Sequence, residues 1–344
     1  MRDIKILTGC VAVLTVIAAG TVLSMAENVF LPLTIAWMLS YLLVPGVRLM
    51  TKFRIPVEIT TVISLALLLW AVTLAGNFLS QRLEGFINAF PTYYERLLVI
   101  AKDASVKFDI SGDIFKGVDW SRELRGYLFS LSGSIVTMTS KTVMVFVFLL
   151  FILIGSPYME YKVRKAFPSK STQVLNMLDT MSSQIGRFLF VMTLISAVTG
   201  ICTWLALSAI GVDFASTWGI VAFALNYIPT VGSIVGAIPP IIVSLVQFYP
   251  HTFEPVLTVA AILAIQMTIG NIITPKVMGD NMNLSPVVIL VSLMMWGWLW
   301  GVAGALLSMP IAAIIKIVCD NVEQLRMLSV LMSSGKSLQK EFEG

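Results

Sequence analysis

Charged side chains are scarce in this chain of 344 residues, since Asp, Glu, Lys and Arg together make up only 12% of it. Soluble domains contain about 25% charged residues, so this chain has too few charges to cover a water-exposed surface. Hydrophobic residues make up 57%, and the mean hydropathy is +0.90. The composition therefore excludes an ordinary soluble domain and predicts a polytopic membrane protein.

Cysteine and histidine are also nearly absent. The three cysteines, Cys10, Cys202 and Cys319, are scattered among the apolar runs, which predicts neither a disulfide framework nor a metal site. The single histidine, His251, is expected in a loop, and with no second histidine an HExxH zinc site is excluded. No phosphate-binding GxxxxGK[ST] motif occurs either. The chain is therefore predicted to be no enzyme and to need no cofactor.

Acidic residues are absent from the centres of the apolar runs, which argues against a strong proton relay. Basic residues lie in short segments between these runs and form no stripe, so no nucleic-acid partner is expected. Their positions predict that both termini are cytoplasmic, because the short turns at Glu27 and Asp213 carry no Lys or Arg. Membrane lipids are the expected surroundings.

Apolar runs near 20 residues in length recur along the chain, and each is long enough to cross roughly 30 Å of hydrocarbon as a helix. They lie at about 4–26, 29–47, 59–79, 136–156, 188–210, 215–249, 255–274 and 286–318. None alternates strictly between polar and apolar residues, so a β-barrel is excluded. The sequence therefore predicts an all-α protein with about eight spans. The first run is expected to be retained as a span, and a cleaved signal peptide is the alternative.

Four segments are predicted along the chain. They are a three-span N-terminal segment (1–80), an extracytoplasmic helical insert (81–135), a C-terminal transmembrane core for transport (136–320) and a cytoplasmic tail (321–344). The insert has two interpretations. It is either a small helical cap that extends the third span, or a gate or partner-docking domain.

Two of the apolar runs are too long for one crossing and contain helix breakers. Run 215–249 would measure roughly 52 Å as a straight helix, and breaks are predicted near 227–232 and near 236–240 because of its prolines. The segment 283–318 is likewise predicted to be broken or re-entrant. Freed backbone groups cannot face lipid, so these breaks must be buried in protein or line a polar cavity.

A further polar break is predicted at 270–283, where Pro275 is expected to end a helix and Gly279 to lie in the loop. Lys276 either meets a polar solute or extends its ammonium group to the membrane interface. The predicted helix-breaking residues are Pro239, Pro240, Pro275, Gly279 and Pro310.

Polar side chains that coincide with these breaks form the candidate substrate path, because interrupted apolar segments mark the binding sites of many transporters. The alternative is that the glycines and prolines serve close helix packing alone. The candidate path residues are Asn226, Tyr227, Pro229, Gly232, Ser233, Gln266, Asn271, Thr274 and Lys276.

Three stretches resemble the autoinducer-2 exporter family of bacterial membrane proteins: FLPLTIAWMLSYLLVPGV (30–47), NYIPTVGSIVGAIPP (226–240) and TPKVMGDNMNLSPVVILVSLMMWGWLWGVAGALLSMP (274–310). The resemblance implies a place in the inner membrane. For some members it implies export of the quorum-sensing signal autoinducer-2, and for others sodium/proton antiport. Thr274 stands where the family often has Glu, so coupling through a carboxylate is less expected here.

Three functions remain open after this comparison of motifs. The first is export of a small polar solute such as autoinducer-2, which the uncharged polar residues at the breaks favour. The second is monovalent cation (sodium)/proton antiport, and the third is a membrane scaffold without transport activity. A homo-oligomer is compatible with each of these.

Overall fold

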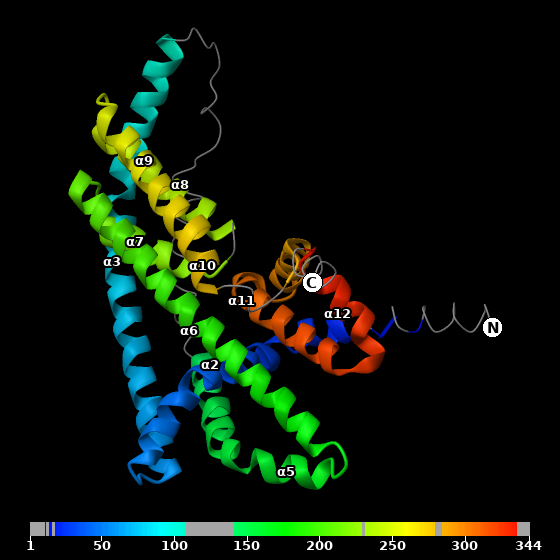
Figure 1. Cartoon of the computed structure of the whole chain (residues 1–344). Helices are drawn as coiled ribbons and strands as arrows, with labels where there is room; N and C mark the ends of the chain where they lie inside the picture. Colours follow the sequence, from blue (N-terminus) through cyan, green and yellow to red (C-terminus); the bar gives the residue numbers. More distant parts are fainter. Residues whose placement is uncertain are drawn as a thin grey trace, which may run out of the picture. The chain divides into compact units, whose positions relative to one another are not determined.

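The computed structural model describes residues 11, 14–15, 18–107, 141–228, 231–278 and 284–335. Regular structure in these residues is entirely helical (Figure 1). The first elements are α2 (Glu27–Lys52), α3 (Val57–Lys107) and the helical segment Lys141–Ala166, which contains η1 (Ser156–Tyr158) and α5 (Met159–Ala166). The remaining elements are α6 (Ser171–Ile210), α7 (Ala215–Leu225), α8 (Val231–Phe248), α9 (Phe253–Thr268), η2 (Ile269–Ile273), α10 (Thr274–Met278), α11 (Pro286–Asn321), η3 (Glu323–Leu325) and α12 (Arg326–Met332).

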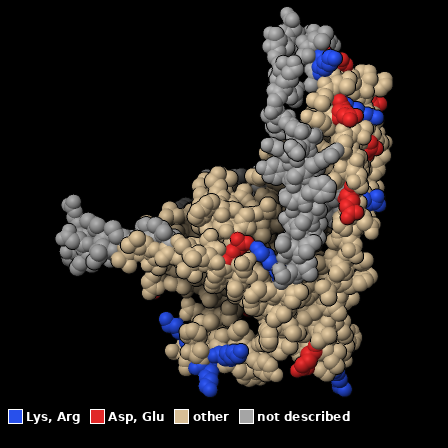
Figure 2. Space-filling model, turned by 180° about the vertical axis from the view of Figure 1, so that it is seen from behind, with Lys and Arg blue, Asp and Glu red and all other residues tan. Residues whose placement is uncertain are grey.

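Seven helices in the described residues are long and apolar enough to cross a membrane. They correspond to seven of the eight predicted runs, and about half of the remaining run, 4–26, lies outside the described residues. On the face shown in Figure 2, charged side chains are few and leave broad uncharged areas, as expected of a surface that faces lipid. The prediction of an all-α polytopic membrane protein is therefore confirmed.

The chain forms two compact units whose segments alternate along the sequence. The first unit contains residues 1–66, 139–190 and 280–344, and the second contains 67–138 and 191–279. Helices α3 and α6 each contribute to both units. The four segments predicted from the sequence are continuous stretches, whereas each compact unit combines stretches that are separated in the sequence. The four segments stay a prediction.

Helix α3 continues well beyond the predicted third span. It has 51 residues and passes through Pro91 without ending. At about 1.5 Å per residue it measures roughly 76 Å, more than twice the thickness of a hydrocarbon core. The described part of the insert, 81–107, therefore continues the helix of the third span. Both interpretations of the insert stay predictions. Residues 108–135 of the insert lie outside the described residues.

Helices α7 and α8 form an antiparallel helical hairpin in the second unit, here called hairpin A (215–248). Its open end is closed by Gln247, whose side-chain oxygen accepts a hydrogen bond from the Asp213 amide and whose Nε2 donates to the Gly211 carbonyl, both at 2.8 Å. At the tip, the chain reverses between Leu225 and Val231. The break predicted near 227–232 is therefore present.

The second break predicted in this run is wrong, because α8 continues through both Pro239 and Pro240. The prediction rested on the excess length of run 215–249. Once the chain reverses at the tip of hairpin A, α8 has only 18 residues, about 27 Å, which fits one bilayer without another interruption. Prolines inside such helices are tolerated where neighbouring groups compensate the missing amide donor.

Helix α11 folds back on itself in the first unit and forms hairpin B (286–321). The helical geometry is lost at Trp300 (φ −128°, ψ 18°) and at Gly301 (φ 60°, ψ −141°), a positive φ that favours glycine. Across the two arms, the Ser292 hydroxyl donates to the Ser308 carbonyl at 2.7 Å. The predicted interruption of 283–318 is therefore present. The expectation that Pro310 breaks the helix is wrong, because Pro310 lies inside the second arm and the reversal at Gly301 has already shortened the run.

The tip of hairpin B is anchored in the core of the first unit. Trp296 and Trp300 are buried in one cluster with Leu31 and Met38 of α2. The Trp300 indole also donates a hydrogen bond to the Leu23 carbonyl at 3.2 Å. Apolar burial of two large aromatic rings makes this tip a firmly packed part of the fold.

Candidate functional site

The tip of hairpin A is held by neutral hydrogen bonds to helix α6. Asn226 Nδ2 donates to Ser196 Oγ at 3.0 Å, and the Tyr227 hydroxyl donates to Thr193 Oγ1 at 2.8 Å. A typical hydrogen bond between neutral groups contributes only about 0.5–1.5 kcal/mol to stability. The tip of hairpin A is therefore fastened by weak contacts between uncharged polar groups.

A third contact joins hairpin A to helix α9. Gln266 Nε2 donates to Ser233 Oγ at 2.6 Å, and Ser233 belongs to the first turn of α8. Beside this contact, α8 approaches α7 so closely that a Cβ atom at position 232 would collide with the Leu225 carbonyl. Glycine is required at this position for the tip to form.

A small cavity of about 30 Å³ lies next to these hydrogen bonds. Its polar lining comes from α6, α8, α9 and the residue that follows α7, and consists of Thr199, Thr203, Asn226, Ser233 and Gln266. A buried water needs about 10–15 Å³ by this measure, so the cavity has room for one or two waters and not for a metabolite. The arrangement is a polar site at a helix break, closed in this conformation to anything larger than water.

The structure thus brings together five of the predicted path residues around hairpin A: Asn226, Tyr227, Gly232, Ser233 and Gln266. Pro229 lies outside the described residues, as does the predicted helix breaker Gly279. The same cavity is walled in part by Pro240 and Gly236 of α8, so Pro240 borders the site although it does not break the helix.

The remaining predicted residues lie elsewhere on the second unit. Asn271 and Lys276 are exposed, and neither lines the cavity. The Thr274 hydroxyl donates to the backbone carbonyl of Ile269 at 2.7 Å and is thus used within its own helix. These three residues are not gathered with the residues at the tip of hairpin A.

Pro275 does not end its helix as predicted. Just before it, Ile269–Ile273 forms a π-helical turn, in which the Thr274 amide bonds to the Ile269 carbonyl five residues earlier. A proline lacks the amide donor and crowds the preceding turn, and the wider π-turn gives the backbone room to continue. The chain therefore remains helical as far as Met278.

Sequence reasoning missed the contribution of α6. Thr193, Ser196, Thr199 and Thr203 recur every three or four residues in the apolar run 188–210, and all four reach hairpin A or its cavity. Such spacing places side chains on one face of a helix. The pattern was present in the sequence, but only polar residues at helix breaks had been considered.

One buried charge was missed for a similar reason. Lys316 lies inside the last apolar run and is only 7% exposed, yet only acidic residues had been sought in the spans. It belongs to the second arm of hairpin B in the first unit, and its contacts are described below.

Comparison with known proteins gives a consistent assignment. The model of the AI-2E family transporter matches residues 10–324. A provisionally named transport protein of Borreliella burgdorferi is 33% identical over 314 residues, which are 91% of this chain and 87% of that protein. The AI-2 transport protein TqsA of Escherichia coli (strain K12) is 29% identical over 313 residues, 90% of each chain. YhhT of the same strain, provisionally named a transport protein, is 34% identical over 206 residues, which cover 60% of this chain and 57% of YhhT.

Proposed function

The chain belongs to the AI-2E transporter family, and we propose that it exports a small polar solute such as autoinducer-2 across the bacterial inner membrane. Membership of a transport family and seven apolar helices support a role in the membrane. The similarity to TqsA, which is named for transport of AI-2, supports this solute. The distribution of Lys and Arg supports an arrangement with both termini in the cytoplasm.

The single observation that carries the proposal is the polar cavity at the tip of hairpin A. In known transporters, helix breaks bring backbone ends and uncharged side chains to the substrate, and hairpin A has such a break within an apolar segment. During transport, Asn226 gives up its hydrogen bond to Ser196, Ser233 and Gln266 give up the bond between them, and these groups bond to the solute instead. Because each exchanged bond is neutral, the site opens without exposing a charge to lipid.

The chemistry of the lining favours an uncharged solute over cation/proton antiport. Its described side chains are hydroxyls, amides and hydrocarbon, without a carboxylate among them. Hydroxyl and amide groups donate and accept hydrogen bonds, so they match a polyhydroxylated or carbonyl-bearing molecule. A carboxylate is the usual group for carrying a proton across a membrane, and this cavity does not supply one from its described residues.

The test measures uptake of labelled autoinducer-2 into proteoliposomes that contain the purified full-length protein. A pH dye inside the same vesicles reports proton movement. The variant Asn226→Leu removes the amide from the cavity, and Asn77→Leu makes the same change at an exposed position of α3. Solute flux that Asn226→Leu lowers and Asn77→Leu leaves unchanged supports the proposal. A cation-driven pH change without solute flux favours antiport. If folded protein gives neither solute uptake nor a pH change, the scaffold interpretation is favoured. Equal flux in Asn226→Leu and the unaltered protein contradicts the proposed path.

A further inference from the structure

Lys316 is a charged residue inside an apolar helix. It lies on the second arm of hairpin B, in the sequence IAAIIKIVCD (311–320), and only 7% of its surface is exposed. Charged side chains are costly within membrane segments and are paired there with a specific partner. The partner of Lys316 therefore indicates what the charge is used for.

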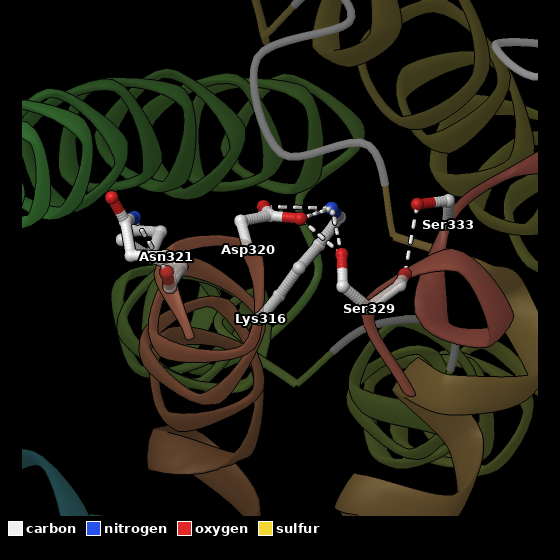
Figure 3. Close-up of polar contacts among 6 residues, drawn as sticks. Lys316, Asp320, Asn321, Ser329 and Ser333 are labelled. Carbon is white, nitrogen blue, oxygen red and sulfur yellow. Dashed lines mark hydrogen bonds and ion pairs between the residues drawn. The ribbon is translucent and has the colours of Figure 1, made fainter. Parts of the chain in front are cut away.

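Figure 3 shows the ammonium group of Lys316 directed at two side chains. One is Asp320, a helical turn later, whose two carboxylate oxygens lie 3.2 and 3.0 Å from Lys316 Nζ. The other is Ser329 of α12, whose hydroxyl oxygen lies 3.5 Å from the same nitrogen. The Ser329 hydroxyl also donates to the Asp320 carboxylate. The three side chains thus form a closed network that joins α11 to α12.

Helix α12 contacts both arms of hairpin B at its open end. The amide of Ser285, just before the first arm, donates to the Met332 carbonyl at the end of α12, at 2.8 Å. The Met332 side chain packs with Leu284 on the same side and with Ala312 of the second arm. Helix α12 therefore lies across the two arms, with Ser329 of the Lys316 network at its middle and Met332 at its end.

Helix α12 depends on these contacts for its position. It has only seven residues, and a helix of that length is not stable in isolation. Its buried residues are Ser329 and Met332, whereas Met327 is 78% exposed and Leu331 67% exposed. Ser329 is thus its one buried polar anchor. Hydrogen bonds to charged groups are roughly twice as strong as neutral ones, so the Lys316 network supplies much of the attachment.

We propose that Lys316 is a positioning residue that holds α12 as a detachable clamp across the open end of hairpin B. With the network formed, α12 keeps the two arms together at residues 285 and 312. When the network breaks, α12 detaches and the open end of hairpin B is free to widen, although its tip stays anchored by Trp296 and Trp300. The clamp acts on hairpin B itself, within the first unit. Its consequence for transport rests on the proposed function.

The chain contains a natural reporter for the clamp. Cys319 is 2% exposed and follows Lys316 by three residues, which places both on one face of α11. Lys316 and Ala312 on this face contact α12, so Cys319 is expected to become more exposed when α12 detaches. With Cys10 and Cys202 replaced by serine, the rate at which a maleimide alkylates Cys319 is therefore the readout. The measurement needs no solute and no flux, so it is independent of the proposed function.

The experiment compares variants of the full-length protein in liposomes. Ser329→Ala and Lys316→Met both break the network and are expected to raise the alkylation rate about tenfold, the effect of losing one hydrogen bond to a charged group. Lys316→Arg keeps a charged donor for Asp320 and is expected to raise the alkylation rate less than Lys316→Met does. The matched control is Ser333→Ala, because the Ser333 hydroxyl donates to the Ser329 carbonyl, one turn earlier, and is not part of the Lys316 network.

Unchanged alkylation in both Ser329→Ala and Lys316→Met overturns the proposal. It also fails if Ser333→Ala accelerates alkylation as much as Ser329→Ala, since the effect is then a general loosening of α12. In flux measurements, the clamp predicts that Ser329→Ala alters the maximal rate and leaves the half-saturating solute concentration unchanged. Faster alkylation with no solute flux in any variant supports the clamp and contradicts the export proposal.

Discussion

The carbonyl oxygen of Leu225 faces the Cα of Gly232 across the tip of hairpin A, with no space left for a side chain at position 232. Hairpin B repeats this relationship, because a Cβ at Gly304 would collide with the Trp296 carbonyl. Two helical hairpins, one in each unit, thus use a glycine on the second arm to admit a carbonyl from the first. The shared geometry makes both tips sensitive to a single added methyl group.

Gly232→Ala is expected to destabilise the protein by about 1–3 kcal/mol or more, because the backbone at the tip must move to admit the methyl group. The control is Gly76→Ala on α3, where a Cβ meets nothing within 4 Å. That change is expected to be neutral or slightly stabilising, since alanine favours a helix by about 1 kcal/mol over glycine. Thermal unfolding in one detergent compares the two, and equal melting temperatures contradict the prediction.

Thr199→Val is expected to lower solute flux about 2- to 10-fold, the effect of one lost hydrogen bond to the solute. The Thr199 hydroxyl donates its proton to the Ile195 carbonyl, so in the cavity it acts as a hydrogen-bond acceptor. Valine has no such acceptor. Thr73→Val is the matched control, because Thr73 makes the same kind of intrahelical bond at an exposed position. Equal flux in the two variants excludes Thr199 from the path.

Tyr227 and Thr193 are expected to act as a pair in stability. Tyr227→Phe and Thr193→Val each remove one side of a 2.8 Å hydrogen bond, and each is expected to cost about 1 kcal/mol. Because the bond is lost in either variant, the double variant should cost less than the sum of the two. A double-mutant cycle from urea or thermal unfolding measures this, and simple additivity shows that the contact contributes nothing.

Asp320→Asn is expected to destabilise the first unit more than Lys316→Met. Asp320 has a side chain that is 47% exposed and stays solvated when Lys316 is lost, whereas Lys316 is buried and loses its counter-charge when Asp320 is replaced. Removing one partner of a fully buried pair costs about 3–5 kcal/mol, and the exposure of Asp320 reduces this value. Melting temperatures of the two variants decide the order, and the reverse order contradicts the assigned pairing.

Tyr249 is expected to titrate above the ordinary pKa of tyrosine. Its hydroxyl donates to Asp103 in the extension of α3, at 3.0 Å, and this hydrogen bond raises the pKa of Tyr249 from 10.0, with burial and the negative charge of Asp103 adding to it. The contact therefore stabilises the protein fully below pH 10 and is lost as the pH rises through the raised pKa. The difference in phenolate absorbance between the protein and Tyr249→Phe reports this group. A difference that titrates at or below pH 10 contradicts the prediction.

Sequence patterns predicted the break at the tip of hairpin A but misplaced others. Proline and glycine near residues 227–232 coincide with excess length, and both signals are local. Pro239, Pro240 and Pro310 carry the same local signal, yet their helices continue. Whether a proline interrupts a helix depends on neighbouring groups that compensate the lost donor, and these come from distant parts of the chain.

The sequence by itself determined the class of the protein, because hydropathy and charge content depend on composition and run length alone. It also determined the residues at the tip of hairpin A, where polar side chains coincide with helix breakers. Only the tertiary structure decided that Gly301 reverses the last run, that the threonines of α6 face the cavity, and that Lys316 reaches Ser329. Periodicity places the threonines on one face of α6 but does not say what that face meets. The backbone conformation at Gly301 and the contact between Lys316 and Ser329 leave no signal in composition or run length.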